Sequence, residues 1–331
     1  MKTDPYHSPA SPPRSGGPGP GTGVGTAPGT FGELLQGELQ DPREAFLVTL
    51  PIEERSVATF QPRADLDDVV VRPACKLKSR EVARRILADN RRAGGGILSI
   101  RSSLPEGKGL ASSSADLVAT ARAVAASLGR RLSASDIEDC LRPVEPSDGV
   151  MYDEVVAFFH RRVRLRARFG FLPPATVVGI DLGGTVDTVR FNRVRQSPRA
   201  AVRREYQGLL ERLQRAVAAG DLAAVGEIST RSAELSLSGC FPAPRDLEPA
   251  RRLCAALGGV GIVTAHSGTM VGTLIDGRPD PEIAARARAV LGCEDSRLFV
   301  YRTVAAPGGD SRREPAHAVP NVPPLVSRET R

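Results

Sequence analysis

The chain has 331 residues, of which 41% are hydrophobic, and a formal net charge of +7 at pH 7. This length allows two modest domains with a real hydrophobic core. No apolar run is long enough to cross a bilayer, so a membrane span is not expected. The five cysteines are scattered without CxxC spacing, which argues against a disulfide framework and against a zinc site.

The excess of positive charge, with a pI of about 9.5, raises the question of nucleic-acid binding. Much of the charge is arginine at positions 161–168, 203 and 204, which we predict to lie on helices. Aromatic residues make up only 4% of the chain and Trp is absent, which leaves few rings for stacking on bases. We therefore interpret the charge as a solvated surface that attracts nucleotide phosphates, and keep nucleic-acid binding as a minor alternative.

Composition divides the chain into two tails and a folded part. Residues 1–23 are rich in Pro and Gly, residues 307–331 are polar, and both segments are expected to be disordered. The first segment lacks the apolar core of a signal peptide, so a cytoplasmic location is expected. Two consecutive prolines suggest a boundary between domains at 24–172 and 173–306.

The pattern of apolar residues predicts strands and helices in both domains. In the first domain we expect strands at 46–52, 56–60, 69–72 and 96–102. The expected helices are at 80–92 (capped by Ser79), 115–128 and 133–142. In the second domain we expect helices at 197–219, 222–237, 247–257 and 281–291, and strands at 261–265, 271–276 and 298–303. This alternation indicates an α+β fold.

The stretch at 105–118 reads Pro-Glu-Gly-Lys-Gly-Leu-Ala-Ser-Ser-Ser-Ala-Asp-Leu-Val, between a predicted strand and a predicted helix. Gly107 and Gly109 let the backbone pass close to a ligand, and the three serines stand where helix N-caps belong. Free N–H groups at a helix start suit an anion such as phosphate. An ordinary capped helix after a glycine-containing turn explains the local pattern equally well.

Two further segments resolve this ambiguity. Residues 26–37 read Thr-Ala-Pro-Gly-Thr-Phe-Gly-Glu-Leu-Leu-Gln-Gly, and residues 264–272 read Thr-Ala-His-Ser-Gly-Thr-Met-Val-Gly. With the serine-rich stretch, they resemble the three ordered motifs of the GHMP small-molecule kinases. The sequences of these segments are most similar to those of the L-threonine kinases of cobalamin biosynthesis. The segment Glu-Pro-Ser-Asp-Gly at 145–149 resembles that family too.

The resemblance implies a two-domain fold. The N-terminal, ATP-binding domain at 24–172 would be like domain 2 of ribosomal protein S5, with a left-handed βαβ unit. The C-terminal domain at 173–306 would be a ferredoxin-like α/β sandwich.

The resemblance also implies a site for ATP and Mg²⁺. The ATP-binding residues would be Pro105, Gly107, Lys108, Gly109, Leu110, Ala111, Ser112, Ser113 and Ser114. Ser112 or Ser113 would bind Mg²⁺ together with Glu145, for which Glu138 and Asp116 are the rivals. A place on a helix surface is the favoured interpretation of Glu138.

Asp148 is the candidate catalytic base, because the family has an aspartate after a short Ser/Gly-containing turn. An Asp before Gly is also a common turn residue. Candidate substrate contacts are Thr30, Glu33, Gln36, Ser267, Gly268 and Thr269. Glu33 would bind an ammonium group, or would be a paired charge at a strand edge. His266 is predicted to be structural.

The segment Asp181-Leu-Gly-Gly-Thr also resembles the phosphate loop of actin-like sugar kinases. In those proteins it opens the first hairpin, whereas here it lies beyond residue 180. We therefore expect a strand and a turn of the second domain, with Asp187 as a candidate substrate contact.

These features predict an ATP- and Mg²⁺-dependent kinase that converts L-threonine to O-phospho-L-threonine. Serine, homoserine or another amino alcohol in a secondary-metabolite pathway are alternatives, because one methyl group changes binding by only about 1–3 kcal/mol. A catalytically silent ligand-binding protein of the same fold is the alternative from another class. The expected partner is a small molecule, without nucleic acid or membrane, and a homodimer is left open.

Overall fold

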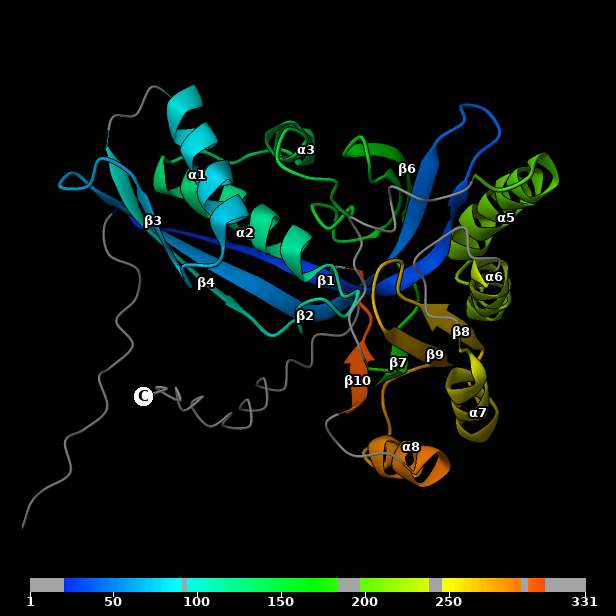
Figure 1. Cartoon of the computed structure of the whole chain (residues 1–331). Helices are drawn as coiled ribbons and strands as arrows, with labels where there is room; N and C mark the ends of the chain where they lie inside the picture. The colour runs from blue at the N-terminus through cyan, green and yellow to red at the C-terminus, as the bar shows by residue number, and fades with distance from the viewer. Residues whose placement is uncertain (1–20, 91–93, 184–196, 238–245, 293–296, 307–331) are drawn as a thin grey trace, which may run out of the picture.

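The computed structural model describes residues 21–90, 94–183, 197–237, 246–292 and 297–306 (Figure 1). Asp187, residues 1–20 of the first predicted tail and the whole second tail lie outside these ranges, and Gly23, predicted in the first tail, begins a strand. The strands of the first half are β1 (Gly23–Glu38), β2 (Ala45–Arg63), β3 (Val69–Arg72), β4 (Gly95–Ser102), β5 (Val155–Phe159) and β6 (Arg164–Gly170). Its helices are α1 (Leu77–Asp89), α2 (Ser112–Ser127) and α3 (Ala134–Leu141).

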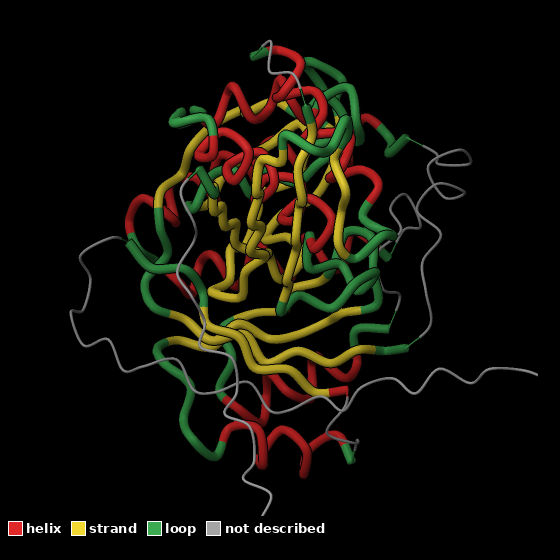
Figure 2. Tube along the Cα trace, turned by 90° about the vertical axis from the view of Figure 1, so that its left-hand side faces the viewer, coloured by secondary structure: helices red, strands yellow, loops and turns green. Residues whose placement is uncertain are grey.

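The second half alternates helices and strands. Its strands are β7 (Ala175–Asp181), β8 (Gly261–Thr264), β9 (Met270–Asp276) and β10 (Leu298–Arg302). Its helices are α5 (Ala200–Ala219), α6 (Leu222–Ser236), α7 (Glu248–Leu257) and α8 (Ile283–Leu291). The helices α1, α2 and α3 lie on one face of the strands β2, β3 and β4 (Figure 1), and further helices lie beneath the lower band of strands in Figure 2.

One ten-stranded sheet runs through both halves. Its main path is β10-β7-β9-β8-β1-β2-β4-β3, with β5 paired to β2 and to β6. The strands β3 and β4 are parallel and are connected by α1, which makes a βαβ unit. The two halves meet where β1 pairs with β8, at Glu33 opposite Thr264. Because this sheet is shared, the predicted boundary at 172/173 remains a prediction.

Apolar residues of the long strands β1 and β2 make the centre of the core. Phe31, Leu34 and Phe46 are fully buried there and belong to one cluster with Tyr206 of α5. Helix α2 packs on β1 and β2, and α6 packs on β8 and on β1 (Figure 1). Alanines along α2 allow this close packing, because a helix that is apolar on most sides can be buried.

Most predicted elements are confirmed, with shifts at their ends. The helix predicted at 80–92 begins at Leu77, and Ser79 is buried inside it instead of capping it. The helix α2 begins three residues earlier than predicted, at Ser112, with Ala111 as its N-cap. The strands predicted at 46–52 and 56–60 form the single strand β2, because β1 pairs along both segments. The helix predicted at 133–142 is confirmed as α3, which Ser133 caps through a capping box with Asp136.

The prediction of a helix for the arginines at 161–168 was wrong, because Arg161 and Arg162 lie in a turn and the others lie on a strand. Arg164, Arg166 and Arg168 lie on β6, where they alternate with Leu165 and Ala167. This period of two is that of a strand. In the described part of the chain no helix is long and apolar enough to cross a membrane, and Cys75, Cys140 and Cys254 are free thiols.

Candidate active site

A cavity of about 830 Å³ lies between the start of α2, the loop after α3 and the loop after β8. The residues that line it are Glu33, Lys78, Gly107, Gly109, Leu110, Ala111, Ser112, Ser113, Ser114, Val144, Glu145, Pro146, Asp148, His160, Arg161, His266 and Ser267. They include residues from all three motifs and from the segment at 145–149, so the fold brings these distant segments together.

The loop before α2 is held by β1. The N–H groups of Thr30 and Gly32 donate to the carbonyls of Leu110 (3.2 Å) and Gly109 (3.3 Å). Ala111 then has a φ of 55°, a left-handed conformation that is unusual for a residue with a side chain. The first N–H groups of a helix have no intrahelical acceptor, and the helix dipole makes this end positive. The start of α2 can therefore bind an anion in the cavity.

Asp148 lies at this same helix start. Its N–H donates to the hydroxyl of Ser114 (3.0 Å), whose oxygen is also 3.5 Å from Asp148 Oδ2. The preceding residue, Ser147, donates its N–H to the carbonyl of His160 (3.1 Å), which fixes the turn. Burial and the negative charge of Glu145 raise the pKa of Asp148 to about 6, despite the hydrogen bond from Ser114. A carboxylate with this pKa is ionised at neutral pH and can accept a proton.

Glu145 provides a second carboxylate in the cavity. Its Oε1 accepts a hydrogen bond from the hydroxyl of Ser113 (2.5 Å), and its Oε2 is paired with Lys78 of α1. A hydroxyl and a carboxylate oxygen placed together are the type of ligand that Mg²⁺ prefers, and Mg²⁺ keeps water and phosphate as its other ligands. The donors therefore fit the predicted metal. No group of three or more His, Cys, Asp and Glu suited to a metal occurs among the described residues.

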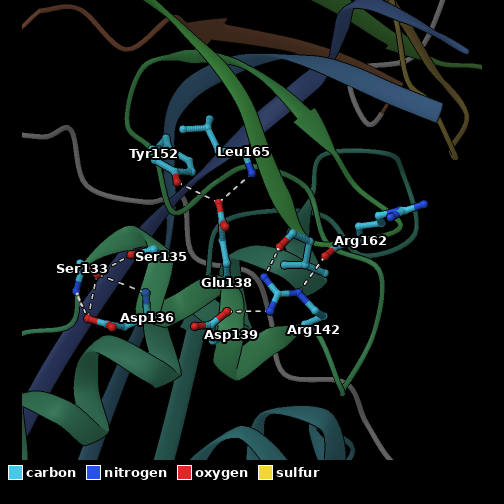
Figure 3. A network of polar contacts seen from close by, with 10 residues as sticks. Ser133, Ser135, Asp136, Glu138, Asp139, Arg142, Tyr152, Arg162 and Leu165 are labelled. Carbon is cyan, nitrogen blue, oxygen red and sulfur yellow. Dashed lines mark hydrogen bonds and ion pairs between the residues drawn. The ribbon is translucent and has the colours of Figure 1, made fainter. Parts of the chain in front are cut away.

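The two rival carboxylates do not line the cavity. Glu138 is 5% exposed and accepts hydrogen bonds from the Tyr152 hydroxyl (2.8 Å) and the Leu165 N–H (2.9 Å) (Figure 3). Glu138 therefore holds α3 to β6. The prediction that it lies on a helix surface was wrong, because its side chain is buried. Asp116 is buried and is bound by Ser56 (2.5 Å) and Lys76 (2.6 Å).

Glu33 is the most unusual side chain of the cavity. It is 4% exposed, and its Oε2 has no hydrogen-bond partner among the described residues. Burial, together with the nearby charge of Asp148, raises the pKa of Glu33 well above its ordinary value. A buried carboxylate without a partner is costly, so a cationic ligand group at this position would stabilise it.

The other predicted substrate contacts in β1 do not line the cavity. Thr30 is buried, and its N–H is used to hold the loop before α2. Gln36 is fully buried, with its Nε2 3.4 Å from Thr264 Oγ1 and its Oε1 2.6 Å from His266 Nδ1.

The third motif is divided between the cavity and the structure around it. His266 and Ser267 line the cavity, and the rings of His266 and His160 lie 5.1 Å apart. Gly268 packs against the backbone of Lys108, and the hydroxyl of Thr269 donates to Asp181. Thus only Ser267 of the three substrate contacts predicted here reaches the cavity.

Lys108 also departs from its predicted place. Its ammonium group is paired with Asp181 at 2.6 Å, and the side chain does not line the cavity. Pro105 does not line it either. The cationic side chains that do are those of Lys78 and Arg161, with His160 and His266 beside them. Lys78 and His160 carry no local sequence signal, because neither belongs to a motif.

Comparisons with known proteins identify the family of the chain. Residues 77–161 match the GHMP kinases N terminal domain, and residues 213–292 match the GHMP kinases C terminal family model. The chain thus carries both domains of the GHMP kinases, which confirms the resemblance of the motifs. It is therefore an ATP-dependent phosphotransferase that acts on a hydroxyl group.

Two curated proteins are similar to the chain over most of its length. The chain is 27% identical to an L-threonine kinase of Citrobacter freundii over 260 residues, which are 76% of this chain and 86% of the relative. It is also 27% identical to an L-threonine kinase of Salmonella typhimurium over 263 residues, 78% of this chain and 84% of the relative.

Solved structures show the same fold at low identity. The mevalonate kinase of Methanococcus jannaschii superposes with a TM-score of 0.66 at 14% identity, covering 89% of this chain and all of that one. The homoserine kinase of Cytophaga hutchinsonii gives 0.62 at 13% identity, covering 91% and 98%.

The raised pKa of Asp148 has a consequence for stability. A folded pKa of about 6, above the ordinary 3.8, gives a contribution that is fully present below the unfolded pKa and is lost as the pH rises through 6. Asparagine does not titrate, so Asp148→Asn removes this loss. The free energy of unfolding of the variant minus that of the wild type should therefore be about 1 kcal/mol larger at pH 8 than at pH 5. Urea unfolding at both pH values measures this difference.

Asp139→Asn, at an exposed position on α3, is the matched control and should show no such trend. A pH-independent difference for Asp148→Asn would mean that this carboxylate is not destabilised by its surroundings.

Proposed function

We propose that this kinase transfers the γ-phosphate of ATP to the side-chain hydroxyl of L-threonine, giving O-phospho-L-threonine. The observation that carries the proposal is the buried carboxylate of Glu33, near Asp148 in the cavity, whose Oε2 has no hydrogen-bond partner in the described part of the chain. A positive charge on the acceptor alcohol would pair with this carboxylate, and the ammonium group of an amino acid supplies such a charge. The similarity to L-threonine kinases supports the choice of threonine.

In this proposal Asp148 is the general base. Its carboxylate accepts the proton of the threonine hydroxyl while that oxygen forms a bond to the γ-phosphorus. The bond between the γ-phosphorus and the bridging oxygen breaks, and ADP leaves. Ser114 keeps the Asp148 backbone at the start of α2, so the base lies next to the phosphate-binding end of the helix.

The phosphates would lie on the N–H groups of Gly107, Gly109 and the first turn of α2. Ser113 and Glu145 would hold Mg²⁺, which neutralises phosphate charge when bound. Lys78 and Arg161 line the same cavity and add positive charge to its wall. Glu33 would bind the ammonium group, and this contact orients the hydroxyl toward Asp148.

The acceptor is tested by measuring ADP release from ATP and Mg²⁺ with L-threonine, L-serine, L-homoserine, ethanolamine and propan-2-ol. We expect L-threonine to give the highest kcat/KM and uncharged propan-2-ol to give none. Glu33→Gln should lower kcat/KM for L-threonine by about tenfold or more, because a charged hydrogen bond is lost. Glu53→Gln, on β2 and outside the lining of the cavity, should leave kcat/KM unchanged. Release no greater than background with every acceptor would rule out the proposed function.

The role of Asp148 is tested by Asp148→Asn in the same assay. The variant should lose about 10²- to 10⁴-fold in kcat, the usual contribution of a general base, and should still bind ATP. In the wild type kcat/KM should fall as the pH drops through about 6, because the base becomes protonated. Asp139→Asn should behave as the wild type, and near-normal turnover of Asp148→Asn would exclude Asp148 as the base.

The metal ligands are tested with Mn²⁺ in place of Mg²⁺. Glu145→Gln should weaken the binding of Mn²⁺ to the complex with a non-hydrolysable ATP analogue by at least about tenfold, measured by electron paramagnetic resonance. Glu81→Gln, at an exposed position on α1, is the control. Equal Mn²⁺ affinity in the two variants would show that Glu145 is not a ligand.

A further inference from the structure

Asp181, the last residue of β7, lies where two loops beside the cavity meet. Its Oδ2 is 2.6 Å from the ammonium group of Lys108, in the loop before α2. Its Oδ1 accepts hydrogen bonds from the hydroxyl of Thr269, in the loop after β8, and from the N–H of Gly183 (2.9 Å). One carboxylate therefore binds both loops to the end of β7, a strand that is paired on both sides with β9 and β10.

This cluster is sheltered from solvent. The side chain of Asp181 is 13% exposed and that of Lys108 is 27% exposed. Burial alone would raise the pKa of Asp181, but the hydrogen bonds from Lys108, Thr269 and Gly183 hold it below its ordinary value. The carboxylate is therefore charged at neutral pH, and water screens the pair less than it screens an exposed ion pair.

The two loops also touch directly, through glycines. Gly109 has a φ of +88°, and a Cβ placed on it would lie 2.3 Å from the Cβ of Ala265. A Cβ on Gly268 would lie 2.2 Å from the carbonyl oxygen of Lys108. Contact of this kind sets the distance between the loops, because neither glycine position has room for a side chain. The ion pair adds a directional bond across the same contact.

The direction of the Lys108 side chain indicates what the pair does. In the described lining of the cavity, Gly107 and Gly109 are present, but Lys108 between them is not. Its ammonium group is directed to Asp181, so Lys108 anchors the loop on one side while its neighbours face the cavity on the other.

We propose that Asp181 is a positioning residue for nucleotide binding. Through Lys108 and Thr269 it fixes the loop before α2 against the second half of the chain, so that the N–H groups of Gly107 and Gly109 are held in place for the phosphates. This inference depends on the proposed function only in that the cavity binds ATP. It does not depend on which alcohol is phosphorylated.

The test is the dissociation constant of ATP with Mg²⁺, measured by calorimetry on the full chain without any acceptor. Asp181→Asn and Lys108→Met should each raise this constant by about tenfold, the effect of losing one sheltered charged bond. The double variant should be no more than about twofold worse than either single variant, because all three lack the same interaction. Asp181→Glu keeps the charge and should recover most of the affinity.

Glu53→Gln is the matched control, because it breaks another ion pair between the halves, Glu53 with Arg302 at 2.7 Å, away from the cavity. It should leave ATP binding unchanged. If Asp181→Asn does not fold, Thr269→Val, which removes only one of the bonds to Asp181, should raise the dissociation constant by about two- to threefold.

Three results would overturn the inference: unchanged ATP binding in Asp181→Asn, additive effects in the double variant, or no recovery with Asp181→Glu. Additivity would mean that Lys108 contacts the phosphates independently of Asp181. If no acceptor raises ADP release above background, by contrast, the threonine assignment is wrong. The role of Asp181 in ATP binding is not affected by that outcome, because its test contains no acceptor.

Discussion

The hydrogen bonds from Thr30 and Gly32 of β1 to the loop before α2 are the constraint on which the site depends. They turn the carbonyls of Gly109 and Leu110 toward β1. Because a carbonyl at the phosphate position would repel an anion, this arrangement leaves the wall of the cavity to the N–H groups and to the start of α2. The first motif thus positions the second motif through backbone hydrogen bonds, independently of any contact between its side chains and a ligand.

A second constraint is electrostatic. Glu33, Glu145 and Asp148 place three carboxylates in one cavity, and burial with mutual repulsion raises the pKa of Glu33 and of Asp148. Such an arrangement costs stability in the empty protein and is characteristic of functional sites, where ligands supply the missing charges. Among these three carboxylates, Glu145 is bound by Ser113 and Lys78, whereas the buried Oε2 of Glu33 has no hydrogen-bond partner among the described residues.

Local sequence signals predicted much of the fold. The predicted limits of α3 and α6 agree with the structure to within one residue, because their signals lie within a few residues. The prediction divided β2 in two because Glu53, Glu54 and Arg55 interrupt its apolar pattern. The strand pairs with β1 on both sides of this point, and a register shift between Pro28 and Gly29 leaves Glu53 and Glu54 without an opposite residue. For β6, the number of arginines concealed an alternation that a strand explains.

For the site, the motifs correctly indicated which segments come together, and less well which side chains face the cavity. Gly107, Ser113, Glu145 and Asp148 line it as a group. Lys78 and His160 could not be predicted, because they reach the cavity from elements without a motif. The direction of Lys108 could not be predicted either, since it depends on Asp181, which is 73 positions away along the chain.

The shared sheet has a consequence for how the protein can be divided. The largest core cluster contains Phe31 and Phe46 from the first half and Tyr206, Val263 and Leu274 from the second. Cutting the gene after codon 172 would expose these apolar surfaces in both fragments and would leave β1 with an unpaired edge beside Glu33. Neither fragment would keep this core cluster complete, so we expect the two halves to fold and to be expressed together.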